Sequence, residues 1–473
     1  MHDENANAEE RTIEPSALTP VSGVSSALVA GKSLVATARS LRAKKVRKGV
    51  NVELPAYLLV QSSWFVAFGL QMVLFPYLIT NRLGLNGVEL GLANMALSAP
   101  SVVFLLLGGV VAERMAGKPL LVMLHIFAAL PAILLGLIIS TGQLLFAHMI
   151  IFGLAIGTVG AFMMPARDAI LNEVIERRSR VGSAITLQQG VAFATLAQFA
   201  AQIGGLVLAG YADKRTMMPA WLGGFGIGPI DAWKLVIFQG IVLSLGSGFA
   251  LYLAKGRQVK TGRKGPGAAF GDMKDGFKAV RNSPELFSMT ILMFGVGLFV
   301  IGSFLVVLPI INRDLYNLGS DGIRDMFVTF WFGAFLSSVA LSLFRSIKYP
   351  GRLLLTAQLL GSLVILLMLR SVPHEVFLGI VFVWGLAAGI SIAMSRSIVQ
   401  NAAPREQLAR VLSIYQLGFM AGAPLGAAIM GYLTDLFGPQ KIAVVPAFGM
   451  TALIAWMVFA TPIWKMTSQD ETA

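Results

Sequence analysis

The stretch GGVVAERMAGKP, residues 108–119, is a short polar join between two long apolar segments. LSAPSVVFLLL (97–107) precedes it and LLVMLHIFAALPAILLGLII (120–139) follows it. An α-helix needs roughly 20 predominantly apolar residues to cross ~30 Å of hydrocarbon. The pattern therefore predicts two membrane-spanning helices joined by a loop that carries Glu113, Arg114 and Lys118.

The whole chain has the composition of a membrane protein. Of its 473 residues 56% are hydrophobic and 13% are charged, whereas soluble domains have about 25% charged residues. Apolar segments of membrane-spanning length recur along it, separated by charged residues, Gly or Pro. The predicted fold class is an all-α polytopic membrane protein with twelve transmembrane helices, at 55–79, 89–111, 119–139, 143–165, 183–211, 233–254, 285–312, 325–344, 352–370, 376–396, 410–434 and 442–464.

The cations divide unequally between the two sides of this predicted topology. The termini and the even-numbered gaps carry 29 Lys and Arg residues, and the odd-numbered gaps carry 8. Short loops rich in Lys and Arg stay in the cytoplasm. We expect a multi-pass protein of the plasma membrane (the bacterial inner membrane) with both termini cytoplasmic. The net charge of +13 then indicates a lipid bilayer with an anionic inner leaflet as partner, and no nucleic acid.

An internal repeat divides the chain into two halves of the same orientation. ARDAILNEVIERRSRVGSAITLQ, from Ala166, parallels SRSIVQNAAPREQLARVLSIYQ, from Ser395, as a short loop after the fourth span of each half. GYAD (210–213) likewise parallels GYLTD (431–435). Such parallel repeats are typical of carriers that rock around a central site. The predicted parts are an N-terminal six-helix bundle at 51–254, a cytoplasmic linker at 255–284, a C-terminal six-helix bundle at 285–464 and a cytoplasmic tail at 465–473.

The first 50 residues form a predicted cytoplasmic N-terminal tail, partly amphipathic and basic. Its cations follow the mildly apolar part, and no adequate apolar core exists, so a signal peptide is disfavoured. An interfacial helix and an unstructured basic tail both remain open.

Residues for enzymatic chemistry are scarce. The chain has no Cys and four His without metal-ligand spacing, and no phosphate-binding loop follows a strand. We therefore expect no catalytic residues, no metal and no cofactor. A membrane enzyme is the least favoured of three function classes, after a transporter and a sensor or scaffold.

The opening stretch resembles the signature loop of the major facilitator superfamily, whose pattern is Gly, an acid, a base, then Gly and further bases. Gly109, Glu113, Arg114, Gly117 and Lys118 carry the resemblance, which covers nearly all of 51–464. In the second half the equivalent loop, LFRSIKYPGR (343–352), lacks the acid. Within the superfamily, PARDAILNEVIERRSRVGSA (165–184) resembles the group of siderophore exporters and macrolide efflux proteins.

The resemblance implies a conformational latch in this loop. A carboxylate at Glu113 could dock on the start of the eleventh span, where a helix N-terminus favours an anion. The alternative is a simple positive-inside anchor. The predicted latch residues are Gly109, Glu113, Arg114, Gly117, Lys118, Arg167, Asp168, Arg396 and Arg410.

Polar and aromatic residues at helical spacing in the first and fifth spans predict a neutral substrate cavity, since amides facing lipid are costly. Amides among aromatic groups suit a small amphipathic organic molecule; helix packing and an interfacial aromatic belt are the alternatives. The predicted cavity residues are Gln61, Trp64, Phe68, Gln71, Thr195, Gln198, Gln202, Trp331, Trp384, Ser391, Tyr415 and Gln416.

Energy coupling has the weakest sequence signal. The candidates for proton coupling are Asp168 and Glu173 at the inner edge, Glu113, and the histidines His125 and His148 within the spans. His148 is singled out because an ordinary His titrates near pH 6.5; a polar residue at a helix end is the alternative, and uniport stays open. We predict a monomeric secondary active transporter that exports a small molecule by alternating access. Protons are a partner only if transport is coupled to their movement. The alternative is a non-transporting sensor or scaffold on a carrier fold.

Overall fold

A computed structural model describes residues 52–180, 187–213, 216–217, 226–227, 230–254, 276–343, 347–404 and 407–467. The predicted N-terminal tail and most of the predicted linker lie outside these residues, as do the side chains of 106, 109, 110, 112–114, 187, 188, 216, 217, 226, 227, 342 and 408–410. Within the described part, twelve helices are long and apolar enough to cross a membrane. The predicted all-α fold is confirmed.

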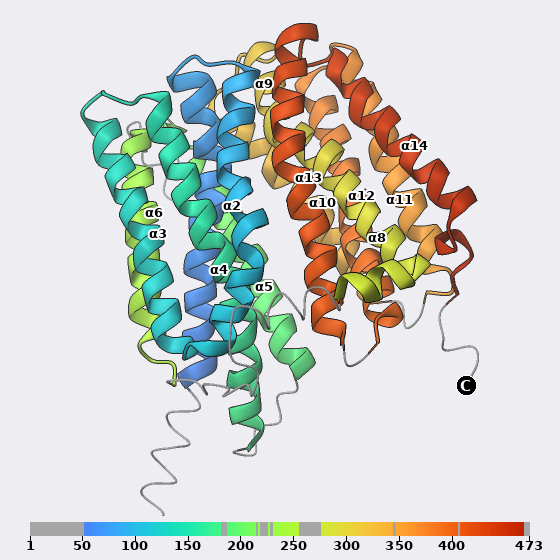
Figure 1. The fold of residues 1–473 in the computed structure, drawn as a ribbon. Helices are drawn as coiled ribbons and strands as arrows, with labels where there is room; N and C mark the ends of the chain where they lie inside the picture. Colours follow the sequence, from blue (N-terminus) through green and yellow to red (C-terminus); the bar gives the residue numbers. More distant parts are fainter. Residues whose placement is uncertain are drawn as a thin grey trace, which may run out of the picture. The chain divides into compact units, whose positions relative to one another are not determined.

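The first half holds six of these helices (Figure 1). They are Val52–Arg82, which ends in the π-helix η1 (Leu78–Arg82), α2 (Gly87–Arg114), α3 (Gly117–Ser140), α4 (Phe146–Arg180), α5 (Leu187–Ala209) and α6 (Ala232–Ala250). A two-stranded antiparallel pair, β1 (Thr216–Met217) and β2 (Gly226–Ile227), lies between α5 and α6.

The second half holds the other six. Its first span, Pro284–Asp314, runs through α8 (Pro284–Gly295), the π-helices η3 (Val296–Ile301) and η4 (Ser303–Val307), and α9 (Leu308–Asp314). The remaining helices are α10 (Ser320–Ser342), α11 (Pro350–Val364) with η5 (Ile365–Leu369), α12 (His374–Ala402), α13 (Leu408–Phe437), and η7 (Lys441–Ala443) with α14 (Val444–Ala460); η8 (Ile463–Lys465) follows.

The fourth span is longer than predicted, because residues 166–180 continue α4 where the sequence predicted a loop. Four apolar residues in this extension, Ile170, Leu171, Val174 and Ile175, are buried at helical spacing. Its polar face is stabilised by Glu–Arg pairs four residues apart, at 173 and 177 and at 176 and 180. The loop prediction was wrong because the polar composition concealed this buried stripe.

Helices α2 and α13 cross closely between the two halves. A Cβ at Gly91 would lie 2.5 Å from the carbonyl oxygen of Ala427, and one at Gly431 would lie 2.2 Å from that of Gly87. Small residues four apart let helix backbones approach in this way. The contact positions the end of α13 directly against the start of α2 (Figure 1).

The helical hairpins define two ends of the described structure. The end with the connections at 83–86 and 315–319 is called the Asn86 end, and the end with the connection at 115–116 and the last residue of α12, Ala402, is called the Met115 end.

Candidate functional site

A carboxylate of the second half caps a helix of the first half at the Asn86 end. Asp435, near the end of α13, accepts hydrogen bonds from the backbone N–H groups of Gly87 (2.7 Å) and Val88 (2.9 Å). These are among the first N–H groups of α2, which have no partner within their own helix. The anion also complements the positive end of the helix dipole.

Arg313, at the end of α9, makes a second link between the halves at this end. Its guanidinium donates to the carbonyl oxygens of Thr80 (3.1 Å) and Leu85 (2.6 Å) and to the side-chain oxygen of Asn86 (3.3 Å). The neighbouring Asp314 holds the same guanidinium at 2.6 Å. One cation thus binds the end of the first span and the two residues just before α2.

A neutral contact joins α5 and α10 at the same end. The hydroxyl of Ser320, the first residue of α10, lies 3.3 Å from the carbonyl oxygen of Gly210 and 2.9 Å from that of Ala212. Arg324 also lies against this segment, with its guanidinium 6.0 Å from the ring centroid of Tyr211. We call Asp435, Arg313, Ser320 and their backbone partners the Asn86-end gate.

The repeat partner of Asp435 behaves differently. Asp213, which ends GYAD, accepts hydrogen bonds from the Tyr77 hydroxyl (3.0 Å), Arg82 (3.3 Å) and the N–H of Ala232 at the start of α6 (2.9 Å). All these groups belong to the first half. The repeat therefore places two similar carboxylates, of which Asp435 alone of the pair is bound across the halves in the described contacts.

Three predicted cavity amides are buried inside the first half. Gln61 donates to the carbonyl oxygen of Ala194 at 2.5 Å, and Gln71 accepts from Gln239 of α6 at 3.3 Å. Among the described side-chain hydrogen bonds, the Gln202 amide donates only to the sulfur of Met72, at 3.6 Å, and a thioether is a weak acceptor. Gln61 and Gln71 thus contribute to helix packing, whereas the amide of Gln202 is weakly satisfied.

The other predicted cavity residues of the first half are more exposed. Phe68 and Thr195 are exposed, while Trp64 and Gln198 are half-buried. The Thr195 hydroxyl donates to the carbonyl oxygen of Val191 in its own helix.

In the second half, the structure separates the predicted cavity residues. Trp384 is buried, with Phe304 and Phe330 against its ring, and the Ser391 hydroxyl donates to Ala387 of its own helix. Tyr415 lies 2.7 Å from the Ser395 hydroxyl, oxygen to oxygen; Gln416 is half-buried.

Aromatic rings meet between α5 and α10. Phe199 lies 6.3 Å from Trp331 and 5.6 Å from Phe335, between ring centroids. The indole Nε1 of Trp331 is buried and has no hydrogen-bond partner among the described residues. This contact joins the two halves through rings and leaves one buried N–H donor unused.

The predicted latch residues at the Met115 end are only partly described. Gly117 packs against Ile170, and Lys118 donates to the carbonyl oxygen of Leu251. Arg396 is exposed. The backbones of Gly109, Glu113, Arg114 and Arg410 belong to α2 and α13, but the environment of these four lies outside the description, so the docking of Glu113 stays a prediction.

Arg167 is a buried cation of α4. Its guanidinium lies 4.9 Å from the ring centroid of Phe65 and 3.5 Å from the carboxylate of the exposed Asp168. Nearby in sequence, Arg177 bridges Glu53 of the first span at 2.9 Å. These described contacts of Arg167 and Arg177 lie within the first half.

His148 lies in the first turn of α4, and its Nδ1 accepts a hydrogen bond from the backbone N–H of Leu145 at 3.1 Å. The contact stabilises the start of the helix. Among the described residues, no group of three His, Cys, Asp or Glu is placed to hold a metal ion.

Sequence reasoning missed Asp435, Arg313, Ser320, Gln239 and Phe199 as functional candidates. The GYAD and GYLTD repeat drew attention to the segment that contains Asp435. Nothing in the sequence indicated which carboxylate of the pair would reach the other half.

Solved structures of low sequence identity share this fold. The nucleoside transporter NupG has a TM-score of 0.63 at 13% identity, over 86% of this chain and 98% of that one. A bacterial homologue of the human lysosomal transporter Spinster, in an inward-facing, unoccupied conformation, gives 0.60 at 14%, over 89% and 96%. The human organic anion transporter MFSD10 gives 0.57 at 15%, over 86% and 99%.

No curated protein sequence matches the chain. The family model of the Major Facilitator Superfamily matches residues 57–427 and 325–471. Together with the twelve membrane-crossing helices, this match indicates a multi-pass membrane transporter of small molecules, as opposed to an enzyme. The chain belongs to the Major Facilitator Superfamily.

Proposed function

We propose that this chain is a secondary active transporter that exports a small amphipathic organic molecule by alternating access. The observation that carries the proposal is the Asn86-end gate, in which Asp435 and Arg313 bind the connection and helix start of the opposite half. Such polar contacts at helix ends can be exchanged for water without disturbing the apolar core. They suit an interface that opens and closes.

In this proposal the Asn86 end faces outward and the Met115 end faces the cytoplasm. The distribution of 29 and 8 cations supports this orientation. The gate then closes the external side in the conformation described. Opening it exposes the substrate site to the outside, while a latch at Glu113 closes the cytoplasmic side.

The proposed substrate site lies between the halves near α5 and α10. Phe199, Trp331 and Phe335 supply aromatic surface, and the unused indole N–H of Trp331 suits a hydrogen-bond acceptor. In this proposal Gln202, which lies three residues after Phe199 on α5 and is buried inside the first half, adds an amide with only a sulfur contact. Apolar walls with a few orienting polar groups are typical of sites for amphipathic molecules.

The resemblance of residues 165–184 to exporters supports the direction of transport. Proton coupling through His148 has less support, because that ring already stabilises the start of α4. We therefore treat protons as a coupling ion to be tested, alongside uniport.

The decisive test is transport by the purified full chain in proteoliposomes, with a panel of amphipathic dyes and drugs, with and without a pH gradient. The same panel is screened for resistance in expressing and deletion cells. A Val88→Cys, Asp435→Cys pair supplies a cross-linking test of the gate, since the native chain has no Cys. Oxidation should lock the gate and stop transport, and reduction should restore it.

Export predicts lower accumulation of at least one compound in expressing cells. If no compound shows counterflow, and expressing and deletion cells do not differ in resistance, the proposal is contradicted. A non-transporting sensor or scaffold would then be favoured.

A further inference from the structure

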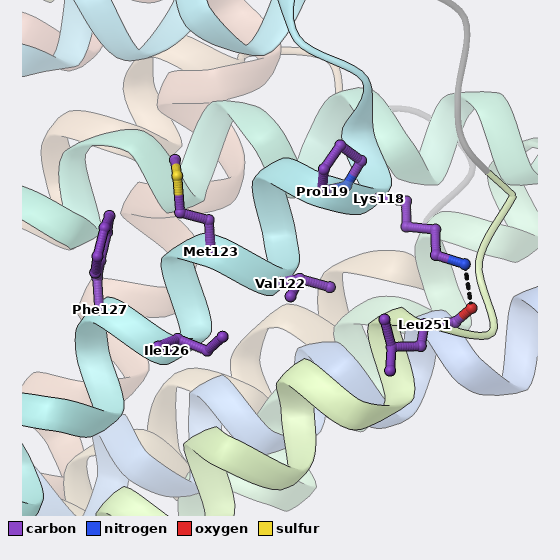
Figure 2. A pocket seen from close by; sticks show the side chains of 7 residues that line it. All are labelled: Lys118, Pro119, Val122, Met123, Ile126, Phe127 and Leu251. Carbon is purple, nitrogen blue, oxygen red and sulfur yellow. Dashed lines mark hydrogen bonds between the residues drawn. The ribbon is translucent and has the colours of Figure 1, made fainter.

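An apolar groove lies on the first half between α3 and the end of α6, near the Met115 end (Figure 2). Its volume is about 590 Å³. Two of its residues, Ile126 and Phe127, are 50% and 53% exposed. The lining residues are Lys118, Pro119, Val122, Met123, Ile126, Phe127 and Leu251.

The groove has one charged end. Lys118, in the first turn of α3, donates a hydrogen bond to the carbonyl oxygen of Leu251, just after α6 (Figure 2). An ammonium group has three N–H donors, and no second bond from Lys118 to a described residue is found. The cation can therefore bind an anion without giving up its contact with α6.

The length of the groove matches one leaflet of a bilayer. Figure 2 shows Lys118 and Leu251 at one end, with Ile126 and Phe127 at the other. Nine residues along a helix, from Lys118 to Phe127, correspond to about 14 Å, and half of the hydrocarbon core is about 15 Å. Lys118 lies at the start of a membrane-crossing helix, so its charge is at headgroup level while Phe127 is near the middle of the membrane.

We propose that this groove binds one anionic phospholipid, with its phosphate at Lys118 and an acyl chain along Val122, Ile126 and Phe127. A cation beside an open apolar channel complements an anionic headgroup with an attached chain. The basic segment 32–48 of the same chain is a poor occupant, because its seven cations would meet Lys118 with like charge. A lipid bound here contacts both α3 and Leu251, so it stabilises the packing of α3 against α6.

Binding is tested on the purified full chain in neutral detergent. Phosphatidylglycerol and phosphatidylcholine with identical acyl chains are titrated, and bound lipid is counted by native mass spectrometry while the unfolding temperature is followed. We expect phosphatidylglycerol to bind more tightly and to raise the unfolding temperature. Equal binding of the two lipids would overturn the proposal, because it would mean a nonspecific lipid surface.

Two variants separate the headgroup from the chain. Lys118→Met keeps an unbranched apolar side chain and removes the charge, so affinity for phosphatidylglycerol should fall about fivefold. Ile126→Trp fills the groove and should lower retention of both lipids. Lys234→Met is the control, since Lys234 is a cation of α6 at the opposite end, bound to Asp231 at 2.8 Å. Unchanged affinity in Lys118→Met would contradict the site.

Two further measurements distinguish other molecules or segments that could fill the groove. Glycerol phosphate or inorganic phosphate should not displace the lipid at equal concentration, and full displacement would reduce the site to a simple anion contact. Deletion of residues 1–50 should leave lipid affinity unchanged; a rise would show that the basic tail is the occupant and would overturn the proposal. These readouts do not depend on transport.

Discussion

The carboxylate of Asp435 accepts a 2.7 Å hydrogen bond from the backbone N–H of Gly87, which joins the end of α13 to the start of α2 across the two halves. The helix crossing behind it has Gly91 and Gly431 at its closest approach. Because the two helix backbones pack closely there, the Asp435 carboxylate reaches the start of α2 with little loss of side-chain freedom.

Neutralising this charge should favour opening of the Asn86 end. In Asp435→Asn the amide still accepts one hydrogen bond but no longer carries the anion, which is worth about 0.3–1 kcal/mol at an exposed helix terminus. We expect the open population to rise about two- to fivefold. Labelling of a Cys at Thr80, which is 1% exposed in the closed gate, measures this directly.

Asp231→Asn is the matched control for Asp435→Asn. Its carboxylate lies at the same end but binds Lys234 within one half. The hydrogen bond from Lys234 lowers the pKa of Asp231, so the control also removes an anion at neutral pH. Equal labelling in both variants would mean that Asp435 has no specific role in the gate.

Arg313→Lys tests the second link of the gate. A lysine keeps the charge but lacks the planar fork that reaches Thr80, Leu85 and Asn86 together. We expect about 1–2 kcal/mol of lost gate stability, seen as faster labelling at the same Cys reporter. Arg370→Lys, at the same end, should leave labelling unchanged.

Arg313 and Asp435 bind adjacent segments, so their effects should be coupled. The double variant Arg313→Lys, Asp435→Asn should open the gate less than the sum of the single effects predicts. Strict additivity would indicate two independent contacts.

Gln61 and Gln202 should respond differently to the same substitution. Gln61→Leu loses a 2.5 Å hydrogen bond to Ala194 and should lower the unfolding temperature with little change in substrate preference. Gln202→Leu loses only a sulfur contact, so stability and membrane abundance should stay near normal while affinity or preference changes. Unchanged transport kinetics across several substrates for Gln202→Leu would assign this residue to packing.

Glu113→Gln should shift the conformational equilibrium in the opposite direction to Asp435→Asn. If Glu113 docks on the start of the eleventh span, losing its charge should expose the Met115 end up to about tenfold more often and reduce transport. A Cys at Gln407 is a better reporter than one at Gly117, where a Cβ would lie 2.5 Å from Ile170. Glu176→Gln, an exposed site near the same end, is the control, and equal labelling rates would reduce the loop to a topological anchor.

The orientation of the chain is tested by labelling in intact cells. A Cys at Ala220 should react with a membrane-impermeant reagent, and a Cys at Gly265 should react only after the membrane is permeabilised. The expectation follows from the 29 to 8 distribution of cations. External labelling at Gly265 would overturn the orientation.

The number and type of the spans could be predicted from the sequence, because the length of an apolar segment is a local property. The polar loop at 108–119 resembled a known signature for the same reason: its residues are adjacent in the chain. Helix ends were less well predicted. The polar residues 166–180 stay helical because Ile170 and Val174 are buried by other helices, which no local pattern of charge reveals.

The sequence by itself thus determined the membrane class, the twelve helices and the two-part repeat, since hydrophobic length and periodicity act along one segment. Only the tertiary structure decided that Asp435 reaches across the halves while Asp213 binds Tyr77, Arg82 and Ala232 in its own half. It also decided that Gln61 packs against another helix while Gln202 keeps a weakly satisfied amide. A polar side chain takes the partner that helix packing brings within hydrogen-bonding distance, and that partner lies far away in the chain.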